Sequence, residues 1–187
     1  MRPRTPVEVW PPLKHLARPP DIGPLLDALA LIPSERRPQL VIAGPADDDD
    51  YGAGLRRRAE RAGVAGDVRW LGWIDGPGLE GLYGLATMFA FLSLYEGFGL
   101  PVLEAMSRGV PVVCSDRSSL PEVAGDPALL FDPESPRSIA EAIDRIVGDP
   151  GEAELMRAAG RARAERFTWS ATARKTLRSY DRALADR

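Results

Sequence analysis

Two glutamates eight positions apart, Glu96 and Glu104, flank a glycine-rich turn in the sequence SLYEGFGLPVLEAMSRG. An apolar run precedes the turn, and a helix is predicted to start at Pro101, because proline suits the first turn of a helix. The backbone N–H groups of residues 98–100 would then lie at the positive end of this helix, where a diphosphate binds well. Carboxylates repel phosphate but accept hydrogen bonds from hydroxyl groups. The pattern therefore indicates a ligand with a diphosphate between two polyols, which is a nucleotide sugar.

The same turn also allows a dinucleotide site. GFGLPV matches G-x-G-x-x-V after a strand and before a helix, and Asp116 follows about where such folds place the carboxylate that binds ribose. Val102 occupies the position of the third glycine, however, and the turn follows a late strand rather than the first. An NAD-dependent oxidoreductase remains an alternative, and the missing glycine counts against it.

Strand and helix patterns alternate through the segments that must position this turn. Apolar runs predict strands at 37–45, 67–74, 87–94, 110–115 and in ALLFDP, and periodic stripes predict helices at 21–32, 51–63, 75–86 and from 101. SLPE has the pattern of a capping box, in which Ser119 starts a short helix that ends at Gly125. Three more helices follow, the first capped by Ser135. This alternation predicts an α/β fold: a single Rossmann-like domain with a parallel sheet of about six strands flanked by helices, and extra C-terminal helices.

The N-terminal segment fits this pattern poorly. VEVWPPLKHLARPP carries Pro11, Pro12, Pro19 and Pro20, and proline cannot serve a central strand. We therefore expect a poorly matched proline-rich segment at 1–20 and a nucleotide-sugar-binding domain at 21–187.

Composition excludes several classes of protein. The chain has 187 residues, of which 44% are hydrophobic, enough for one α/β domain or for half of a larger enzyme. Its net charge of −3, with both signs mixed along the chain, lacks the basic footprint of a nucleic-acid binder. No apolar run approaches the ~20 residues that cross a bilayer, so no transmembrane segment is expected. The N-terminus lacks the apolar core of a secretory leader, which predicts a cytoplasmic protein, associated with a membrane if its acceptor is lipid-linked.

The sequence gives little support for a disulfide or a metal site. The single cysteine, Cys114, and the single histidine, His15, exclude an intramolecular disulfide and a cysteine–histidine metal site. Cys114 lies in an apolar strand pattern and is predicted to be buried. The acidic run ADDDDYG, residues 46–52, is interpreted as a solvated loop before a helix rather than a metal motif.

The segment SLYEGFGLPVLEAMSRGVPVVCSDRSSLPEVAGDPALLFDP closely resembles the signature of family 4 glycosyltransferases of the GT-B architecture. The resemblance runs from about Asp21 to the C-terminus and includes LVIAGP, VRWLGWI, LYGLATMF and RFTWSATARKTLRSY. It implies the C-terminal, donor-binding domain of a retaining, metal-independent glycosyltransferase, with a UDP- or GDP-sugar as donor and no other cofactor. SSLPEVAGD is similar to the version in mannosyl- and rhamnosyl-type members, which implies a donor such as GDP-mannose and a role in polysaccharide biosynthesis.

The resemblance also implies roles for individual residues. Glu96 would contact the hydroxyls of the donor sugar and is the candidate catalytic residue, while Glu104 would bind the ribose. The remaining donor-binding candidates are Gly97, Phe98, Gly99 and Leu100, which would line the sugar and diphosphate through their backbone, and Gly72, Trp73 and Ile74, which would lie near the nucleobase.

Two departures from the family pattern stand out. The family has a glycine, an arginine and a lysine in the loop after the first strand, where the basic pair neutralises the leaving diphosphate. Here Pro20 stands at the lysine and His15 near the arginine, which leaves Arg18 and Lys14 as candidate phosphate-binding residues. A full member also has an N-terminal acceptor-binding domain, so the expected partner is such a domain or a second copy, packed against the helix beyond Trp169. A degenerate stand-alone domain that binds nucleotide sugars, or serves as an interaction module, remains an alternative.

Overall fold

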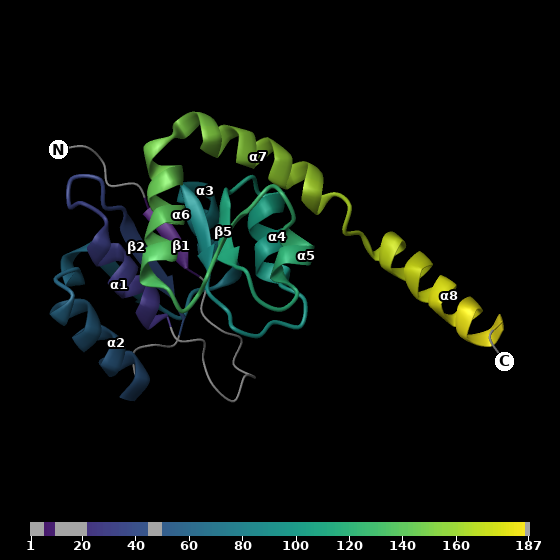
Figure 1. Ribbon diagram of the computed structural model, residues 1–187, viewed down its shortest axis with the longest axis horizontal. Coiled ribbons are helices and arrows are strands. Elements are labelled where there is room, and N and C mark those ends of the chain that lie inside the picture. Colours follow the sequence, from purple (N-terminus) through teal and green to yellow (C-terminus); the bar gives the residue numbers. More distant parts are fainter. Residues whose placement is uncertain (1–5, 10–21, 45–49, 186–187) are drawn as a thin grey trace.

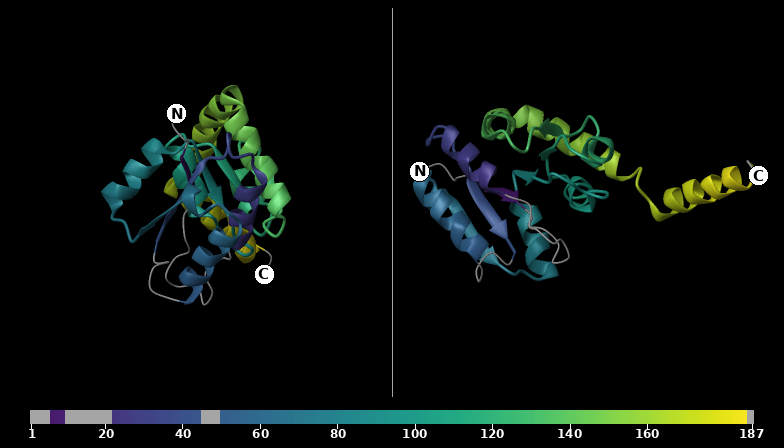
Figure 2. Two further views of the ribbon diagram at one scale, coloured as in Figure 1. Left: turned by 90° about the vertical axis from the view of Figure 1, so that its left-hand side faces the viewer. Right: turned by 60° about the horizontal axis from the view of Figure 1, so that its bottom comes forward.

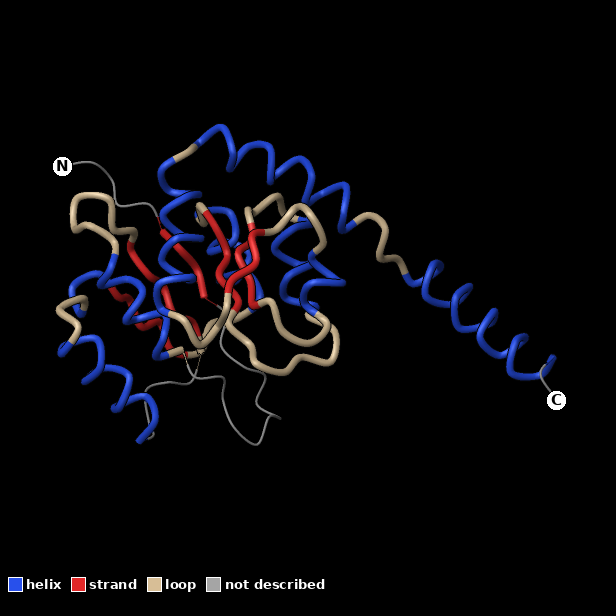
Figure 3. The backbone as a smooth tube through the Cα atoms, in the orientation of Figure 1, coloured by secondary structure: helices blue, strands red, loops and turns tan. Residues whose placement is uncertain are grey.

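The computed structural model describes residues 6–9, 22–44 and 50–185, which form a sheet between two layers of helices and a separate C-terminal helix (Figure 1). Figure 3 shows the strands lying side by side with helices on both faces. The strands are β1 (Pro6–Val9), β2 (Gln39–Ala43), β3 (Val68–Gly72), β4 (Met88–Phe91), β5 (Val112–Ser115) and β6 (Leu129–Phe131). They pair in the order β3-β2-β1-β4-β5-β6, and every pair is parallel. The predicted α/β, Rossmann-like class is confirmed.

The helices follow the strands in the alternation that the sequence predicts. They are α1 (Gly23–Leu31), α2 (Asp50–Arg61), α3 (Gly76–Leu85), α4 (Leu100–Ser107), α5 (Leu120–Ala124), α6 (Pro136–Gly148), α7 (Pro150–Ala164) and α8 (Trp169–Ala185), with a single 3₁₀ turn at Ala65–Asp67. Ser135 caps α6 as predicted, because its hydroxyl accepts a hydrogen bond from the amide of Ser138 at 3.3 Å. Such a bond satisfies one of the amide groups that a helix start leaves without a partner.

The two faces of the sheet carry two apolar cores. Successive side chains of a strand point to opposite faces, and in β4 Met88 and Ala90 join one core while Phe89 and Phe91 join the other. Among the helices, α1 and α6 contribute the most residues to the first core, and α4 and α5 the most to the second. Because both faces of the sheet are covered there, β4 and β5 are buried along their whole length, and β4 is apolar throughout, as its sequence suggested.

Strand β1 corrects the prediction made for the N-terminal segment. Pro6–Val9 is a central strand, paired with β2 through Val7 and Leu40 and with β4 through Val9 and Ala90. The sequence argument failed because Pro6 occupies the first position of the strand, where proline is tolerated. The four prolines that counted against a strand come after Val9 and lie outside the described residues.

Helix α8 stands apart from the rest of the domain. Figure 1 and the right-hand view of Figure 2 show it extending away from the sheet, and none of its residues is buried. Trp169 is 90% exposed, and the apolar stripe of Leu177, Tyr180 and Leu184 also faces solvent. No helix within the described ranges is long and apolar enough to cross a membrane.

Candidate functional site

The glycine-rich turn lies where the order of the strands reverses. From β1 the chain builds outward to β2 and β3 on one side, and from β4 to β5 and β6 on the other. The carboxyl ends of the neighbouring strands β1 and β4 therefore meet at a topological switch point, where open α/β sheets bind their ligands. The turn of residues 95–99 follows β4 after residues 92–94 and leads into α4.

The backbone of the turn leaves several amides without a hydrogen-bond acceptor among the described residues. Gly99 is the N-cap of α4 and has a left-handed φ of 98°, and the helix starts at Leu100, one residue before the predicted position. Within the described part of the chain, the amides of Gly97, Phe98, Gly99 and Leu100 donate no hydrogen bond. Such amides at a helix N-terminus can receive an anionic ligand.

The two glutamates flank this start of α4. Glu96 is half-buried in the turn, and Glu104 is exposed at the fifth position of the helix. Neither carboxylate forms an ion pair with another described residue. Both can therefore accept hydrogen bonds from the hydroxyl groups of a ligand.

Glu104 lies in a groove of about 490 Å³ that Glu96 does not line. Phe98 and Leu100 form one wall of this groove, and Phe167 and Trp169 form the other. Phe98 meets Phe167 edge to face, with ring centroids 6.0 Å apart. Phe167, between α7 and α8, was not among the sequence candidates, since its place beside the turn depends on tertiary packing.

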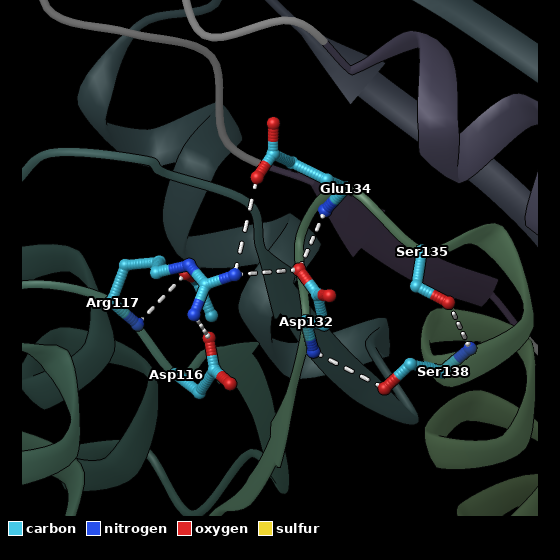
Figure 4. Close-up of polar contacts among 7 residues, drawn as sticks. Asp116, Arg117, Asp132, Glu134, Ser135 and Ser138 are labelled. Carbon is cyan, nitrogen blue, oxygen red and sulfur yellow. Dashed lines mark hydrogen bonds and ion pairs between the residues drawn. The ribbon is translucent and has the colours of Figure 1, made fainter.

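Arg117, in the loop after β5, contacts carboxylates from its own loop and from the loop after β6 (Figure 4). Arg117 contacts Asp116 at 3.2 Å, Asp132 at 3.1 Å and Glu134 at 3.9 Å. Three carboxylates compensate its charge, so it is not available to neutralise a diphosphate. Asp116, the candidate ribose ligand of a dinucleotide site, is itself bound to Arg117, and the dinucleotide interpretation loses support.

The remaining candidates lie apart from the turn. Gly72 ends the edge strand β3, and residues 73–74 follow it, at the same end of the sheet but three strand spacings from β4, or roughly 14 Å. Gly72 is buried with a φ of 63°, and Trp73 is exposed. Lys14, His15 and Arg18 lie outside the described residues, as do positions 46–49 of the acidic run.

Cys114 is buried in β5 as predicted, and burial raises the pKa of its thiol from 9.0 to about 12. Desolvation disfavours the charged thiolate, so the thiol stays neutral and unreactive at physiological pH.

Ser118 and Ser119 are functional candidates that the sequence did not reveal. The capping box predicted at Ser119 is wrong, because its hydroxyl makes no bond to its own helix. The hydroxyls of Ser118 and Ser119 instead both donate to the backbone carbonyl of Glu96, each at 2.8 Å. Only the pairing of the loops after β4 and β5 brings these segments together, and local sequence carries no signal for it.

Comparison with known proteins defines the class of this site. The fold is a Rossmann-like α/β domain, and residues 17–163 match the family model "Glycosyl transferases group 1". The chain belongs to this family of glycosyltransferases.

Individual relatives agree with this assignment. The chain is 40% identical over 163 residues to the O-antigen chain mannosyltransferase B of Escherichia coli, covering 86% of this chain and 42% of the relative. Its structure matches sucrose-phosphate synthase from Thermosynechococcus elongatus with a TM-score of 0.77 at 30% identity, over 98% of this chain and 46% of the synthase. The fold also matches Anabaena HepE in complex with UDP and glucose, with a TM-score of 0.80 at 22% identity, over 95% of this chain and 48% of HepE. The chain thus spans less than half the length of these relatives.

Proposed function

We propose that this chain is the donor-binding half of a retaining glycosyltransferase, which transfers a sugar from a nucleotide-diphosphate sugar to an acceptor held by an N-terminal domain. One observation carries the proposal: at the start of α4, backbone amides lie between the carboxylates of Glu96 and Glu104, and among the described residues these amides have no acceptor and these carboxylates no ion-pair partner. The amides suit the diphosphate, and the carboxylates suit the sugar and ribose hydroxyls on either side of it.

In this proposal Glu96 holds the transferred sugar and Glu104 holds the ribose. Glu96 is the residue nearest in role to catalysis, since it contacts the sugar whose bond to the diphosphate breaks. Trp73, which is exposed, would lie near the base together with Gly72 and Ile74.

Cations for the leaving diphosphate would come from the segment after β1. Arg18 and Lys14 follow β1 in the sequence, and the carboxyl end of β1 adjoins that of β4 at the switch point. Because three carboxylates occupy Arg117, these two residues are the candidates for the positive charge that such a reaction uses.

The donor that we propose is a GDP- or UDP-sugar, with GDP-mannose first. The relative that is 40% identical is named a mannosyltransferase, and HepE was crystallised with UDP and glucose. The proposed partner is an N-terminal acceptor-binding domain or a second copy of the chain, which would cover the exposed stripe of α8. A role in polysaccharide assembly follows from the O-antigen relative, and contact with a membrane would come through a lipid-linked acceptor.

Calorimetric titration with UDP, GDP, UDP-glucose, GDP-mannose and NAD tests the proposal. We expect one nucleotide sugar to bind more tightly than its nucleotide, and NAD not to bind. Binding of NAD without any nucleotide sugar would overturn the proposal in favour of an oxidoreductase.

A second candidate is a degenerate module that binds a partner but no donor. The compensated charge of Arg117, together with Pro20 at the position where the family has a lysine, favours it. Failure of every nucleotide to bind, with a stable complex formed with an N-terminal domain of a related enzyme, would support the module. Turnover in a transfer assay with that complex would exclude it.

A further inference from the structure

We propose that Ser118 and Ser119 are positioning residues for the donor sugar, because together they fix the peptide that carries Glu96. This inference rests on the proposed function and adds to it the part of the chain that aims the candidate carboxylate. Both hydroxyls donate to the Glu96 carbonyl at 2.8 Å, across 22 and 23 residues of sequence. A carbonyl oxygen has two lone pairs, so these two donors saturate it.

The backbone of Ser118 supports a role for its side chain. Its φ of 57° makes it the one non-glycine residue with a positive φ in the described part of the chain, where six glycines share that region. A residue other than glycine is unfavourable in this conformation, and a strained residue at a site is a pointer to function. Glycine would adopt the same turn more easily but would lack the hydroxyl that reaches Glu96.

Ser119 gives up a local bond for the same contact. It occupies the N-cap of α5, where a serine hydroxyl ordinarily accepts a bond from an amide in the first turn of its helix. Here that bond is absent, and the hydroxyl contacts the carbonyl of Glu96. Two neighbouring serines, one with an unfavourable φ and one without its usual capping bond, thus both donate to the same carbonyl oxygen.

Fixing the Glu96 carbonyl sets the direction of two groups of the candidate site, the Gly97 amide and the Glu96 side chain. A trans peptide is planar, so its N–H points opposite to its C=O. With the Glu96 carbonyl held toward α5, the Gly97 amide points away from α5 and stays free to donate. The same restraint sets the direction in which the Glu96 side chain leaves the backbone. Ser93, which is buried, adds a third tie, since its hydroxyl donates to the Tyr95 carbonyl at 3.0 Å.

The test compares nucleotide sugar with nucleoside monophosphate on the same variants. The monophosphate keeps the base and ribose but lacks the sugar, so it reports on Glu104 without Glu96. We expect Ser118→Gly or Ser119→Ala to weaken binding of GDP-mannose or UDP-glucose roughly fivefold, and the double variant roughly 20-fold. Binding of GMP or UMP should stay within about twofold. Ser179→Ala, which removes a similar hydroxyl-to-carbonyl bond on α8, should change neither.

Two readouts separate positioning from stability. Ser118→Gly relieves the unfavourable backbone conformation, so its melting temperature should stay unchanged or rise while sugar binding weakens. If the serines had only a structural role, their replacement would lower the stability and the affinities for both nucleotide sugar and monophosphate together. Ser119→Thr keeps a hydroxyl and should restore sugar binding to within about twofold of the wild type.

A ligand-free measurement completes the design. In the double variant, ¹⁵N relaxation should show a lower order parameter for the Gly97 amide than in the wild type. If the wild type binds a nucleotide sugar, and the variants keep both its sugar preference and the order of Gly97, the inference is wrong while the proposed function stands. If the wild type binds neither nucleotide sugar nor nucleotide, the proposed function fails, and the role in sugar binding fails with it.

Discussion

Leu120 packs directly over Gly99, so closely that a Cβ on Gly99 would lie 2.7 Å from Cδ2 of Leu120. Gly99 precedes α4, and Leu120 is the fully buried first residue of α5. The contact joins the two loops at the carboxyl ends of β4 and β5, beside the serine contacts to Glu96. The glycine is therefore required by packing as well as by its φ of 98°.

Gly99→Ala should lower the free energy of unfolding by about 2–3 kcal/mol, from the left-handed backbone and the clash with Leu120. Urea denaturation measures this loss. Gly97→Ala is the matched control, because a Cβ there meets open space and its φ is not positive, so it should cost less than about 1 kcal/mol. The double variant Gly99→Ala/Leu120→Ala should lose less stability than the sum of the losses measured for the two single variants. Strict additivity would show that the contact is not the source of the strain.

Glu104→Gln should weaken the binding of GMP and of GDP-mannose (or of UMP and UDP-glucose) to the same extent, roughly tenfold or more. The reason is that a hydrogen bond from the ribose to a charged acceptor is lost. Glu96→Gln should weaken the binding of the nucleotide sugar by a similar factor and leave the binding of the monophosphate unchanged. Calorimetry on both ligands measures the two effects. Glu60→Gln, at an exposed position of α2, is the control. If all three variants bind like the wild type, neither glutamate is part of a donor site.

Removal of residues 169–187 should leave the stability of the remaining domain within about 0.5 kcal/mol of the full chain. No residue of α8 is buried, so little apolar surface is returned to water. Thermal and urea unfolding of the two chains provide the comparison. A loss above about 1 kcal/mol would mean that α8 folds back onto the domain in solution.

Alkaline pH should destabilise the protein through Cys114. The unfolded thiol ionises near 9.0, while the folded thiol has a pKa of about 12, so the native state binds more protons between these values. Stability from this group is complete below pH 9 and falls by up to about 1.4 kcal/mol per pH unit above it. Cys114→Ala should show a shallower decline of unfolding free energy between pH 9 and pH 11. Equal slopes would contradict the assignment, as would rapid reaction of the native thiol with Ellman's reagent at pH 8.

Local sequence predicted the elements around the turn because each signal there is short-range. The apolar run before Glu96, the proline at position 101 and the glycine at position 125 each act within one turn of backbone, and the elements lie where expected to within a few residues. Family resemblance and these local signals agreed on the class of fold and on the class of protein.

Long-range relationships were beyond the same reasoning. The capping box at Ser119 was a sound local pattern, but a carbonyl 23 residues earlier competes for the hydroxyl. The prolines after Val9 hid a strand whose partners begin 30 residues later in the chain. The contact of Phe167 with Phe98 depends on how α7 packs against α4, which the local sequence does not specify.

The position of β1 has a consequence for how the chain reaches its native state. Four N-terminal residues lie between β2 and β4, and without them the sheet would consist of two separate ribbons, β3-β2 and β4-β5-β6. Each ribbon would then expose an apolar strand with unpaired backbone groups, which is a template for aggregation. Since β1 is synthesised well before its partner β4, its late docking would complete the sheet and remove this risk. Expression of any shortened version should therefore keep residues 6–9.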